Sequence, residues 1–351
     1  MTDEIEPGLF GLQNNTNRDF RLQETWGKNQ FPSSFPASLC CYFYSKGINA
    51  NYLCFRNGES IVEEISIPDI FGKKPDDEDT FFAFESVYTP FNRYVIGNLP
   101  RTDLVVQEKK SGICLSGLEI KLTALPDNVT CNSTENLYGS EIVVRPDTIV
   151  YLACSIATSL NGKLGNILPN ITVDDWEIPY QVLIKASELI DAIDSISISL
   201  NDSQSPFLLQ PIWKTKGKSP ELSENCLDIF VWSNAGFCRF ISEIAKSNLN
   251  GSISRQMRTV IWLFKMLEGI KKVGQFDHKL IIDSMSFNNK NDKAFASSGN
   301  ITNRFMRCDR LSKPILKKEE IKNIILGGGQ NLLSPERRFD AIIYNSPELF
   351  K

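Results

Sequence analysis

Two short apolar runs carry three ionisable side chains that can share one piece of chemistry. Asp103 lies in the first run, Pro-Arg-Thr-Asp-Leu-Val-Val, and Glu119 and Lys121 lie in the second, Gly-Leu-Glu-Ile-Lys-Leu. In the second run apolar residues alternate with Glu119 and Lys121, which is the period of a β-strand with one buried and one wet face. We therefore expect Glu119 and Lys121 to lie side by side on the wet face, and a paired first strand to bring Asp103 to the same edge.

Two acids and a lysine in one cleft are typical of a metal-dependent phosphodiesterase. Mg²⁺ prefers oxygen ligands, commonly one or two carboxylates with waters and substrate phosphate oxygens, so Asp103 and Glu119 are the expected ligands. The ion would polarise the scissile phosphate and lower the pKa of a bound water. Lys121 is expected to position or deprotonate that water and to stabilise the charge of the transition state.

A third acid, Glu85, lies in the apolar run Phe-Phe-Ala-Phe-Glu-Ser, upstream of Asp103. A carboxylate on the element that precedes the two strands can complete or orient the metal site. A surface glutamate on a helix or an edge strand is the competing interpretation, and the sequence leaves both open.

Other catalytic chemistries find little support in the chain. The single histidine, His278, argues against histidine triads and H-E-x-x-H metal sites, and a structural or surface role is expected for it. The nine cysteines include no C-x-x-C pair, so we expect reduced, mostly buried thiols and no structural zinc. The Gly-Lys-Ser at residues 217–219 ends like a P-loop, but Ile212 stands where the first glycine must be.

A second acid, acid and lysine set is formed by Asp309, Glu320 and Lys322. Residues 317–326 have the pattern of a helix, on which Glu320 and Lys322 would point about 200° apart. That divergence argues against a shared metal at this copy.

Composition and charge set the limits of the organisation. The 351 residues are 42% hydrophobic, enough for one large elaborated domain or two domains. No apolar stretch approaches the roughly 20 residues of a membrane span, and the acidic start has no signal-peptide pattern, so a soluble, cytoplasmic protein is expected. Residues 1–200 hold 15 Lys and Arg against 27 Asp and Glu, and residues 201–351 hold 23 against 15. This fits a carboxylate site beside a DNA-contacting region, or simply an uneven surface charge.

The expected elements make an α/β (α+β) fold. We expect strands over residues 60–67, 142–147 and 226–232, a buried hairpin over 39–55, and helices over 148–157, 182–193 and 253–273. On the last helix Arg258 is expected on a solvated basic rim. Residues 204–219 read as a loop, which places a boundary near 201–222 between an N-terminal arm with the catalytic core (1–200) and a C-terminal basic, α-rich region (201–351) that contacts DNA and completes the core.

At the two apolar runs the chain resembles the HindVP family of type II restriction endonucleases, within the PD-(D/E)XK nucleases. The resemblance rests on Thr-Asp-Leu-Val at residues 102–105 and on Gly-Leu-Glu-Ile-Lys-Leu-Thr-Ala-Leu-Pro-Asp at 117–127. It extends to Trp-Gly-Lys-Asn-Gln-Phe at 26–31 and to Gly-Gly-Gln-Asn-Leu-Leu-Ser-Pro-Glu-Arg-Arg-Phe-Asp at 328–340. Thr102 stands where the signature has Pro, a departure expected to cost little because that Pro is a turn residue and not a ligand.

The resemblance implies a mixed central sheet flanked by helices and Mg²⁺-dependent cleavage of double-stranded DNA at a short palindrome of the type GRCGYC. A palindromic target implies a homodimer in which each subunit cuts one strand, and a restriction-modification system implies a cognate DNA methyltransferase. Arginine commonly reads guanine in the major groove. The candidate DNA contacts are Arg304, Arg307, Arg310, Arg337 and Arg338.

Two alternatives remain at this point. Another PD-(D/E)XK nuclease, such as a repair or resolving enzyme, would share the site without cutting at a fixed sequence. A non-catalytic DNA-binding protein would bind DNA and be indifferent to the loss of Glu119 or Lys121.

Overall fold

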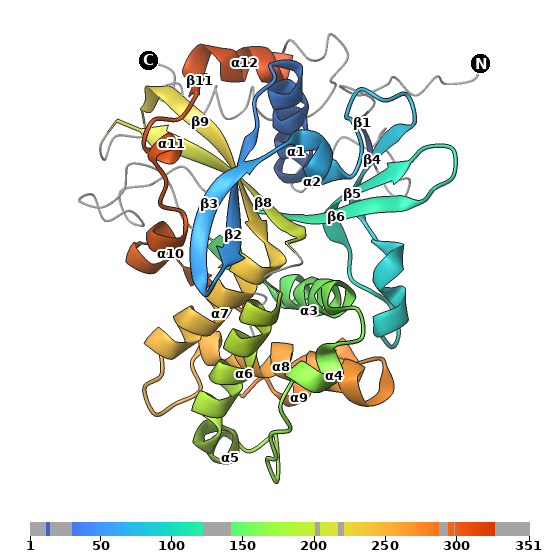
Figure 1. The fold of residues 1–351 in the computed structure, drawn as a ribbon, viewed down its shortest axis with the longest axis vertical. Coiled ribbons are helices and arrows are strands. Elements are labelled where there is room, and N and C mark those ends of the chain that lie inside the picture. Colours follow the sequence, from blue (N-terminus) through green and yellow to red (C-terminus); the bar gives the residue numbers. More distant parts are fainter. Residues whose placement is uncertain are drawn as a thin grey trace.

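The structure is a computed structural model, and it describes residues 12–14, 30–121, 142–200, 204–216, 221–287, 294–297 and 299–326. Its centre is a nine-stranded mixed sheet in the order β1-β4-β5-β6-β8-β9-β2-β3, with β11 also paired to β9 (Figure 1). The strands of this sheet are β1 (Leu12–Asn14), β2 (Ala50–Arg56), β3 (Glu59–Ile65), β4 (Thr80–Ser86), β5 (Thr102–Glu108), β6 (Cys114–Ile120), β8 (Pro206–Thr215), β9 (Leu222–Ser233) and β11 (Leu316–Lys317). Short strands β7 (Ile142–Val144) and β10 (Phe295–Ser297) form a separate antiparallel pair.

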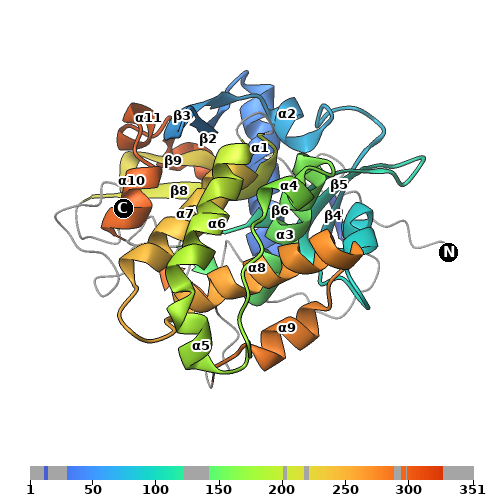
Figure 2. The same cartoon turned by 60° about the horizontal axis from the view of Figure 1, so that its bottom comes forward.

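Helices cover both faces of the sheet, as expected (Figures 1 and 2). On one side lie α1 (Gln30–Ser45), α2 (Ile67–Phe71) and α12 (Lys318–Leu326). On the other lie α3 (Pro146–Leu160), α6 (Ala186–Ser199), α7 (Asn234–Ser247) and α8 (Arg255–Val273). Shorter helices are η2 (Thr89–Tyr94), α4 (Leu164–Ile167), α5 (Pro179–Ile184), α9 (His278–Ser284), α10 (Asn300–Phe305) and α11 (Asp309–Ser312). None of the helices described has the length and apolar character needed to cross a bilayer.

Alternation along the strands divides the core into two apolar layers. On β2, Leu53 and Phe55 pack with the layer of α3, α6, α7 and α8, whereas Tyr52 and Cys54 pack with the layer of α1, α2 and α12. Successive side chains of a strand point to opposite faces, so a strand covered on both sides is apolar at nearly every position. The sheet is therefore a buried layer between two helical layers.

The hairpin of β5 and β6 pairs the two runs that carry the predicted site, which confirms the expected strand pairing. The pairing is antiparallel, with Val105 opposite Gly117 and Leu104 opposite Leu118. The ring of Tyr88 covers Gly117 so closely that a Cβ there would lie 2.7 Å from the ring. Glycine is required at this position because any side chain would displace the tyrosine.

The expected hairpin at residues 39–55 is wrong in its first half. Residues 39–45 belong to α1, and the chain turns at Gly47, which has a φ of 66°, before entering β2. Leu39, Cys40 and Phe43 are fully buried. An apolar run that is buried on every side has no period, so it does not distinguish a core helix from a core strand.

Two further expectations need correction. The helix expected over residues 182–193 is two helices, α5 and α6, which meet at Lys185. The loop expected over 204–219 is largely β8, which pairs with β6 on one side and with β9 on the other. Pro211 is tolerated within this strand, where it lies opposite Ile229. Residues after 201 thus supply central strands to the same sheet that holds the hairpin.

The remaining expected elements are confirmed where the structure describes them. They are the strand β3 near 60–67, the strand β7 followed by α3 from residue 142, the strand β9 over 226–232, the helix α8 over 253–273 and the helix α12 near the C-terminal end. The eight cysteines in the described ranges are free thiols. The first eleven residues, residues 15–29 and the Gly-Lys-Ser at 217–219 lie outside the described residues.

Candidate active site

The predicted site residues come together at one end of the β5–β6 hairpin. The backbone N–H of Ile120, between Glu119 and Lys121, donates a 2.7 Å hydrogen bond to Oδ2 of Asp103. Nζ of Lys121 lies 2.9 Å from Oε2 of Glu119. The backbone N–H of Lys121 donates to the carbonyl of Leu209 on β8, at 3.0 Å. Three strands therefore hold the two acids and the lysine.

The expectation that Glu119 faces water is wrong. The residue is only 5% exposed. Two buried hydroxyls donate to its carboxylate, Thr148 at 3.0 Å to Oε2 and Thr102 at 3.2 Å to Oε1. The first turn of α3 carries Thr148, so this helix covers the strand face that alternation alone assigned to solvent. The carboxylate is buried and hydrogen-bonded at both oxygens.

Burial and neighbouring charges shift the pKa values of Asp103 and Lys121. Burial, followed by the negative charge of Glu119, raises the pKa of Asp103 from its ordinary 3.8 to about 7, against the opposing effects of Lys121 and the Ile120 N–H. Burial on its own would lower the pKa of Lys121, but the charges of Glu119 and Asp103 outweigh it and raise that pKa. Lys121 is therefore a protonated ammonium at neutral pH, which suits electrostatic stabilisation better than proton abstraction.

Glu85 is brought near Asp103 by the register of β4 and β5. In the β4–β5 ladder Phe84 pairs with Leu104 and Ser86 with Thr102, which places residue 85 opposite residue 103. Its negative charge contributes to the raised pKa of Asp103. Glu85 has a φ of 49°, a left-handed conformation that is uncommon for a residue with a side chain and that gathers at functional sites.

The donor set fits a divalent cation of the Mg²⁺ type. Across the part of the chain that is described, no group of three or more His, Cys, Asp or Glu side chains is arranged as a metal site. Mg²⁺ needs fewer protein ligands than that, because it usually keeps several waters and takes one or two carboxylates. A pair of adjacent, mutually repelling carboxylates is stabilised by a cation placed between them. The half-buried Asp103 and the buried Glu119 are such a pair.

Sequence reasoning missed the contribution of α3. Arg145, Pro146 and Asp147 begin the helix, and the Pro at its start is a recognisable N-terminal signal. Burial and then the charge of Glu119 raise the pKa of Asp147, so this acid lies within electrostatic range of the site. The helix was predictable from these residues, whereas the contact of Thr148 with Glu119 was not, because it depends on how α3 packs against β6.

Thr102 stands where the family signature has a proline that serves as a turn residue. In this structure Thr102 also forms hydrogen bonds at the site. It is the first residue of β5, it is 1% exposed, and its hydroxyl can donate either to the carbonyl of Leu118 at 3.0 Å or to Oε1 of Glu119 at 3.2 Å. A proline could supply neither contact. The departure therefore adds a hydrogen-bonding group to the site and does not merely replace a turn residue.

His278 begins α9 and is buried, in agreement with a structural role. Burial lowers its pKa, partly opposed by Asp147 and Asp277. The Nδ1 atom is buried and, among the residues described, makes no hydrogen bond.

The expected arginine contacts divide into three groups. Arg310 donates from Nε and Nη2 to both oxygens of the fully buried Asp228, at 2.9 Å each, and Nη1 lies 3.3 Å from Glu64. This arrangement leaves it little freedom to read a base. Arg304 is exposed but pairs with Glu243, and Arg307 is exposed. Arg337 and Arg338 lie outside the described residues.

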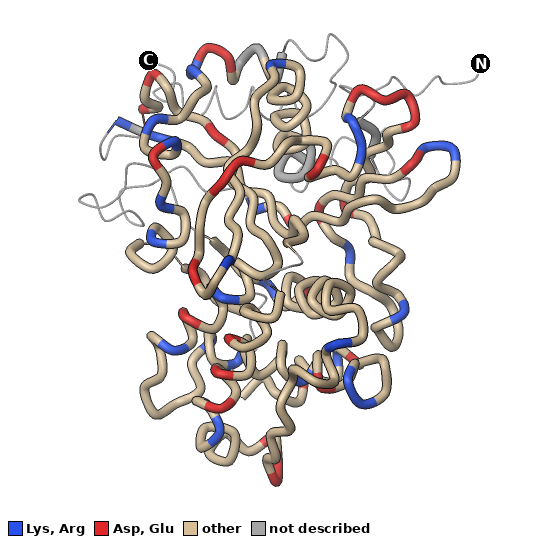
Figure 3. Tube along the Cα trace, viewed as in Figure 1, with Lys and Arg blue, Asp and Glu red and all other residues tan. Residues whose placement is uncertain are grey.

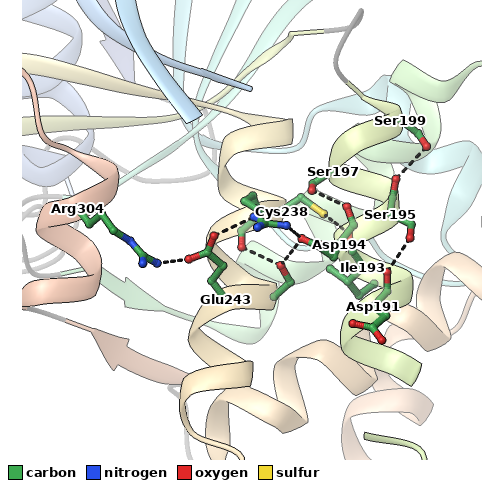
Figure 4. A network of polar contacts seen from close by, with 11 residues as sticks. Asp191, Ile193, Asp194, Ser195, Ser197, Ser199, Cys238, Glu243 and Arg304 are labelled. Atoms are coloured by element: carbon green, nitrogen blue, oxygen red, sulfur yellow. Dashed lines mark hydrogen bonds and ion pairs between the residues drawn. The ribbon is translucent and has the colours of Figure 1, made fainter. Parts of the chain in front are cut away.

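Figure 4 shows the network to which Arg304 belongs. From α10, Arg304 reaches Glu243 on α7, which also pairs with Arg239 at 2.9 Å. Arg239 pairs in turn with Asp194 on α6. Both signs of charge occur in the upper and the lower half of the molecule, so the basic excess after residue 201 does not form a separate half (Figure 3). The charge imbalance of the sequence thus gives no direct guide to a DNA surface.

Two further expectations can be compared with the structure. Arg258 was expected on a solvated rim, but it is 1% exposed, donates to the carbonyl of Ser286 at 3.2 Å and lies over the ring of Trp262. In the second acid and lysine set, Glu320 on α12 accepts hydrogen bonds from the hydroxyl of Tyr42 and the N–H of Lys317.

Comparison with known proteins assigns the chain to a family. The profile of the HindVP restriction endonuclease family matches residues 26–350. The chain is 54% identical to "Probable type II restriction enzyme HindVP" of Haemophilus influenzae, over 99% of this chain and 96% of that protein. It is 41% identical to "Type II restriction enzyme HgiDI" of Herpetosiphon aurantiacus, over 99% and 98% respectively. No solved structure matches. The chain belongs to the HindVP restriction endonuclease family.

Proposed function

We propose that this protein is a type II restriction endonuclease that hydrolyses phosphodiester bonds of double-stranded DNA at a short palindrome, with Mg²⁺ held by Asp103 and Glu119. The observation that carries the proposal is the pair of acids, half-buried Asp103 and buried Glu119, with Lys121 ion-paired to Glu119 at one end of the β5–β6 hairpin. Membership of the family and the names of the two relatives support the class of reaction.

In this proposal each residue has a defined task. The cation, when bound, polarises the scissile phosphate and lowers the pKa of a bound water. Asp103 is held in place by the Ile120 N–H, and Glu119 by Thr102, Thr148 and Lys121. Protonated Lys121 stabilises the negative charge that develops on the phosphoryl oxygens, in a site whose burial strengthens that interaction.

Glu85 is proposed as a third acidic group at the same site. Its place opposite Asp103 allows it to bind the cation directly or through a water. Glu85→Gln separates these functions from a purely structural one, because it keeps the shape of the side chain while removing its charge.

The resemblance to the family also supports finer proposals. We propose a recognition site of the type GRCGYC, a homodimer in which each subunit cuts one strand, and a cognate DNA methyltransferase that protects the same site. Arg304 and Arg307 on the surface, and Arg337 and Arg338, are the proposed DNA contacts. Arg310 is assigned instead to the buried ion pair with Asp228.

Plasmid digestion tests the proposal. Purified protein with Mg²⁺ should cut a plasmid of known sequence into discrete fragments whose ends map to one palindromic site, and EDTA should abolish cutting. Glu119→Gln and Lys121→Met should reduce cleavage by at least about 100-fold while DNA binding persists. Glu59→Gln, an exposed glutamate on β3, is the matched control and should cut normally.

Two results would reject the proposal in different ways. A continuous smear in place of discrete bands would indicate a nuclease without fixed sequence specificity. Cleavage by Glu119→Gln at the wild-type rate would show that the chemistry lies elsewhere in the chain.

A further inference from the structure

The Glu119 carboxylate receives three hydrogen-bond donors, and they divide unequally between its oxygens. Oε2 accepts from Nζ of Lys121 at 2.9 Å and from the hydroxyl of Thr148 at 3.0 Å. Oε1 accepts only from the hydroxyl of Thr102, at the longer distance of 3.2 Å, among the contacts described. One donor on Oε2 belongs to the residue that directly follows β6 and the other to α3, so they fix the orientation of the carboxylate from two directions.

Thr102 can satisfy only one acceptor at a time. A threonine hydroxyl has one proton to donate, and two acceptors lie within its reach, the carbonyl of Leu118 at 3.0 Å and Oε1 of Glu119 at 3.2 Å. When a cation binds Oε1, the hydroxyl can turn to the Leu118 carbonyl without leaving its proton unpaired. Oε1 is therefore the oxygen that can be released for a ligand, whereas Oε2 is held.

We propose that Thr148 and Thr102 are positioning residues for the metal site, with Thr148 fixing the orientation of Glu119 and Thr102 presenting Oε1 to the cation. The inference rests on the proposed function and deepens it. Both hydroxyls are buried, Thr148 at 0% and Thr102 at 1% exposure, so water cannot take their place when they are removed. Partners that orient a metal-binding carboxylate typically contribute 10–100-fold to metal affinity or activity.

The position of Thr148 also makes the site depend on the packing of α3. This helix packs on the sheet through residues such as Ile149, Tyr151 and Leu152, all buried. The hydroxyl of Tyr151 donates to the carbonyl of Pro100 at 2.8 Å, three residues before Asp103. The helix that orients Glu119 is thus also tied to the segment that leads into the strand of Asp103.

Metal binding to the DNA-free protein tests this role without relying on cleavage. Mn²⁺ affinity is measured by the electron paramagnetic resonance signal of the free ion for wild type, Thr148→Val and Thr148→Ser. Thr148→Val keeps the shape of the side chain and removes the donor, and we expect about 10-fold weaker Mn²⁺ binding. Thr148→Ser restores the hydroxyl and should bind close to the wild-type level.

A matched control is available in the same helical layer. Thr259 on α8 is also fully buried, but its hydroxyl donates to the carbonyl of Arg255 in its own helix, at 2.9 Å. Thr259→Val should leave Mn²⁺ affinity unchanged. Thermal unfolding of each variant establishes that the fold is retained.

The kinetics of plasmid cleavage provide the second measurement. Thr148→Val should lower kcat about 10-fold with little change in the KM for DNA, because the substrate does not contact this hydroxyl. Thr102→Val should weaken Mn²⁺ binding less than Thr148→Val, because its proton leaves Oε1 when the ion binds.

Several outcomes would overturn the inference. If Thr148→Val bound Mn²⁺ with wild-type affinity, Thr148 would have no positioning role. If Thr148→Ser lost as much Mn²⁺ affinity as Thr148→Val, the loss would be due to altered packing and not to the missing hydroxyl. Equal losses in the Thr102 and Thr148 variants would contradict the division between the two oxygens. If Glu119→Gln also bound Mn²⁺ and cut DNA normally, the proposed function itself would fail. If Glu119→Gln were inactive while Thr148→Val bound Mn²⁺ and cut DNA like wild type, only the inference about the threonines would be rejected.

Discussion

The N–H of Ile120 donates a 2.7 Å hydrogen bond to Oδ2 of Asp103, so the strand that carries Glu119 and Lys121 also holds the acid of its neighbour. One oxygen of Asp103 is thereby occupied by the backbone. The acid nevertheless remains costly to ionise, because its burial and the adjacent Glu119 raise its pKa to about 7. This cost leads to a prediction about stability as well as activity.

Asp103→Asn should inactivate the enzyme and stabilise the metal-free protein at alkaline pH. The folded pKa of about 7 lies above the ordinary 3.8, so the stability linked to this group is full below about pH 4 and is lost as the pH rises through 7. Asparagine never ionises and can still accept from Ile120. Chemical unfolding in EDTA should therefore show the variant more stable than wild type at pH 8, by an amount on the order of 1–3 kcal/mol, with a much smaller difference at pH 5. A difference that does not change with pH would contradict the prediction.

Lys121→Met should destabilise the fold, and Glu119→Gln should reverse most of that loss. Removing the ammonium leaves a buried carboxylate without its ion-pair partner, which typically costs about 3–5 kcal/mol. The double variant has no uncompensated charge at position 119. Urea unfolding of the wild type, the two single variants and the double variant gives the interaction energy. All three variants should fail to cut plasmid DNA, and additive losses of stability would argue against the ion pair.

Arg310→Met should lower stability without changing where DNA is cut. Asp228 is fully buried, and Arg310 donates a hydrogen bond to each of its two carboxylate oxygens. Removing the guanidinium should therefore lower the free energy of unfolding by about 3–5 kcal/mol. Asp228→Asn in the same chain should recover part of it. Fragment patterns are the second measurement: a changed or relaxed cutting site in Arg310→Met, under conditions where the protein is folded, would indicate that the arginine reads DNA after all.

Gly117→Ala should impair both stability and cleavage. The added methyl group would lie 2.7 Å from the ring of Tyr88, on the same strand as Glu119 and two residues before it. Overpacking of this kind costs about 1–3 kcal/mol. Tyr88→Leu in the same chain makes room and should recover a substantial part of the unfolding free energy. Gly165→Ala, where a Cβ meets nothing within 4 Å, is the control and should behave like wild type.

Local sequence patterns were sufficient to predict the β5–β6 hairpin, but they did not predict that α3 covers the strand face that carries Glu119. The alternation of Leu118 and Ile120 with Glu119 and Lys121 correctly predicted β6, and the spacing to Asp103 correctly predicted its pairing with β5. The same alternation assigned Glu119 to solvent, because a strand pattern does not record that another helix lies on its polar face. Only the packing of α3 brings Thr148 to that carboxylate.

Segments buried on all sides were the least predictable from sequence. The apolar stretch through Cys40 and Phe43 has neither a helical nor a strand period, and it forms α1 where a hairpin was expected. The segment that contains the Gln-Pro-Ile-Trp of β8 has a proline and lysine content typical of a loop, yet it is a strand in which Leu208 and Leu209 are completely buried. Charge was equally uninformative for Arg258 and Arg310, since whether a guanidinium is buried depends on acceptors far away in the sequence.

The hydrogen bond from the N–H of Lys121 to the carbonyl of Leu209 has a consequence for the order in which the protein is made. Strand β6 lies at the edge of the β4–β5–β6 unit until β8 is added to it, and β8 is itself paired with β9. A ribosome-bound chain that ends before residue 206 therefore contains Asp103, Glu119 and Lys121 but lacks the strand that holds the backbone of the lysine. The protein therefore becomes able to cut DNA only late in translation, after β8 has been made. If the chain were divided before residue 206, both fragments would have to be present together to restore DNA cleavage.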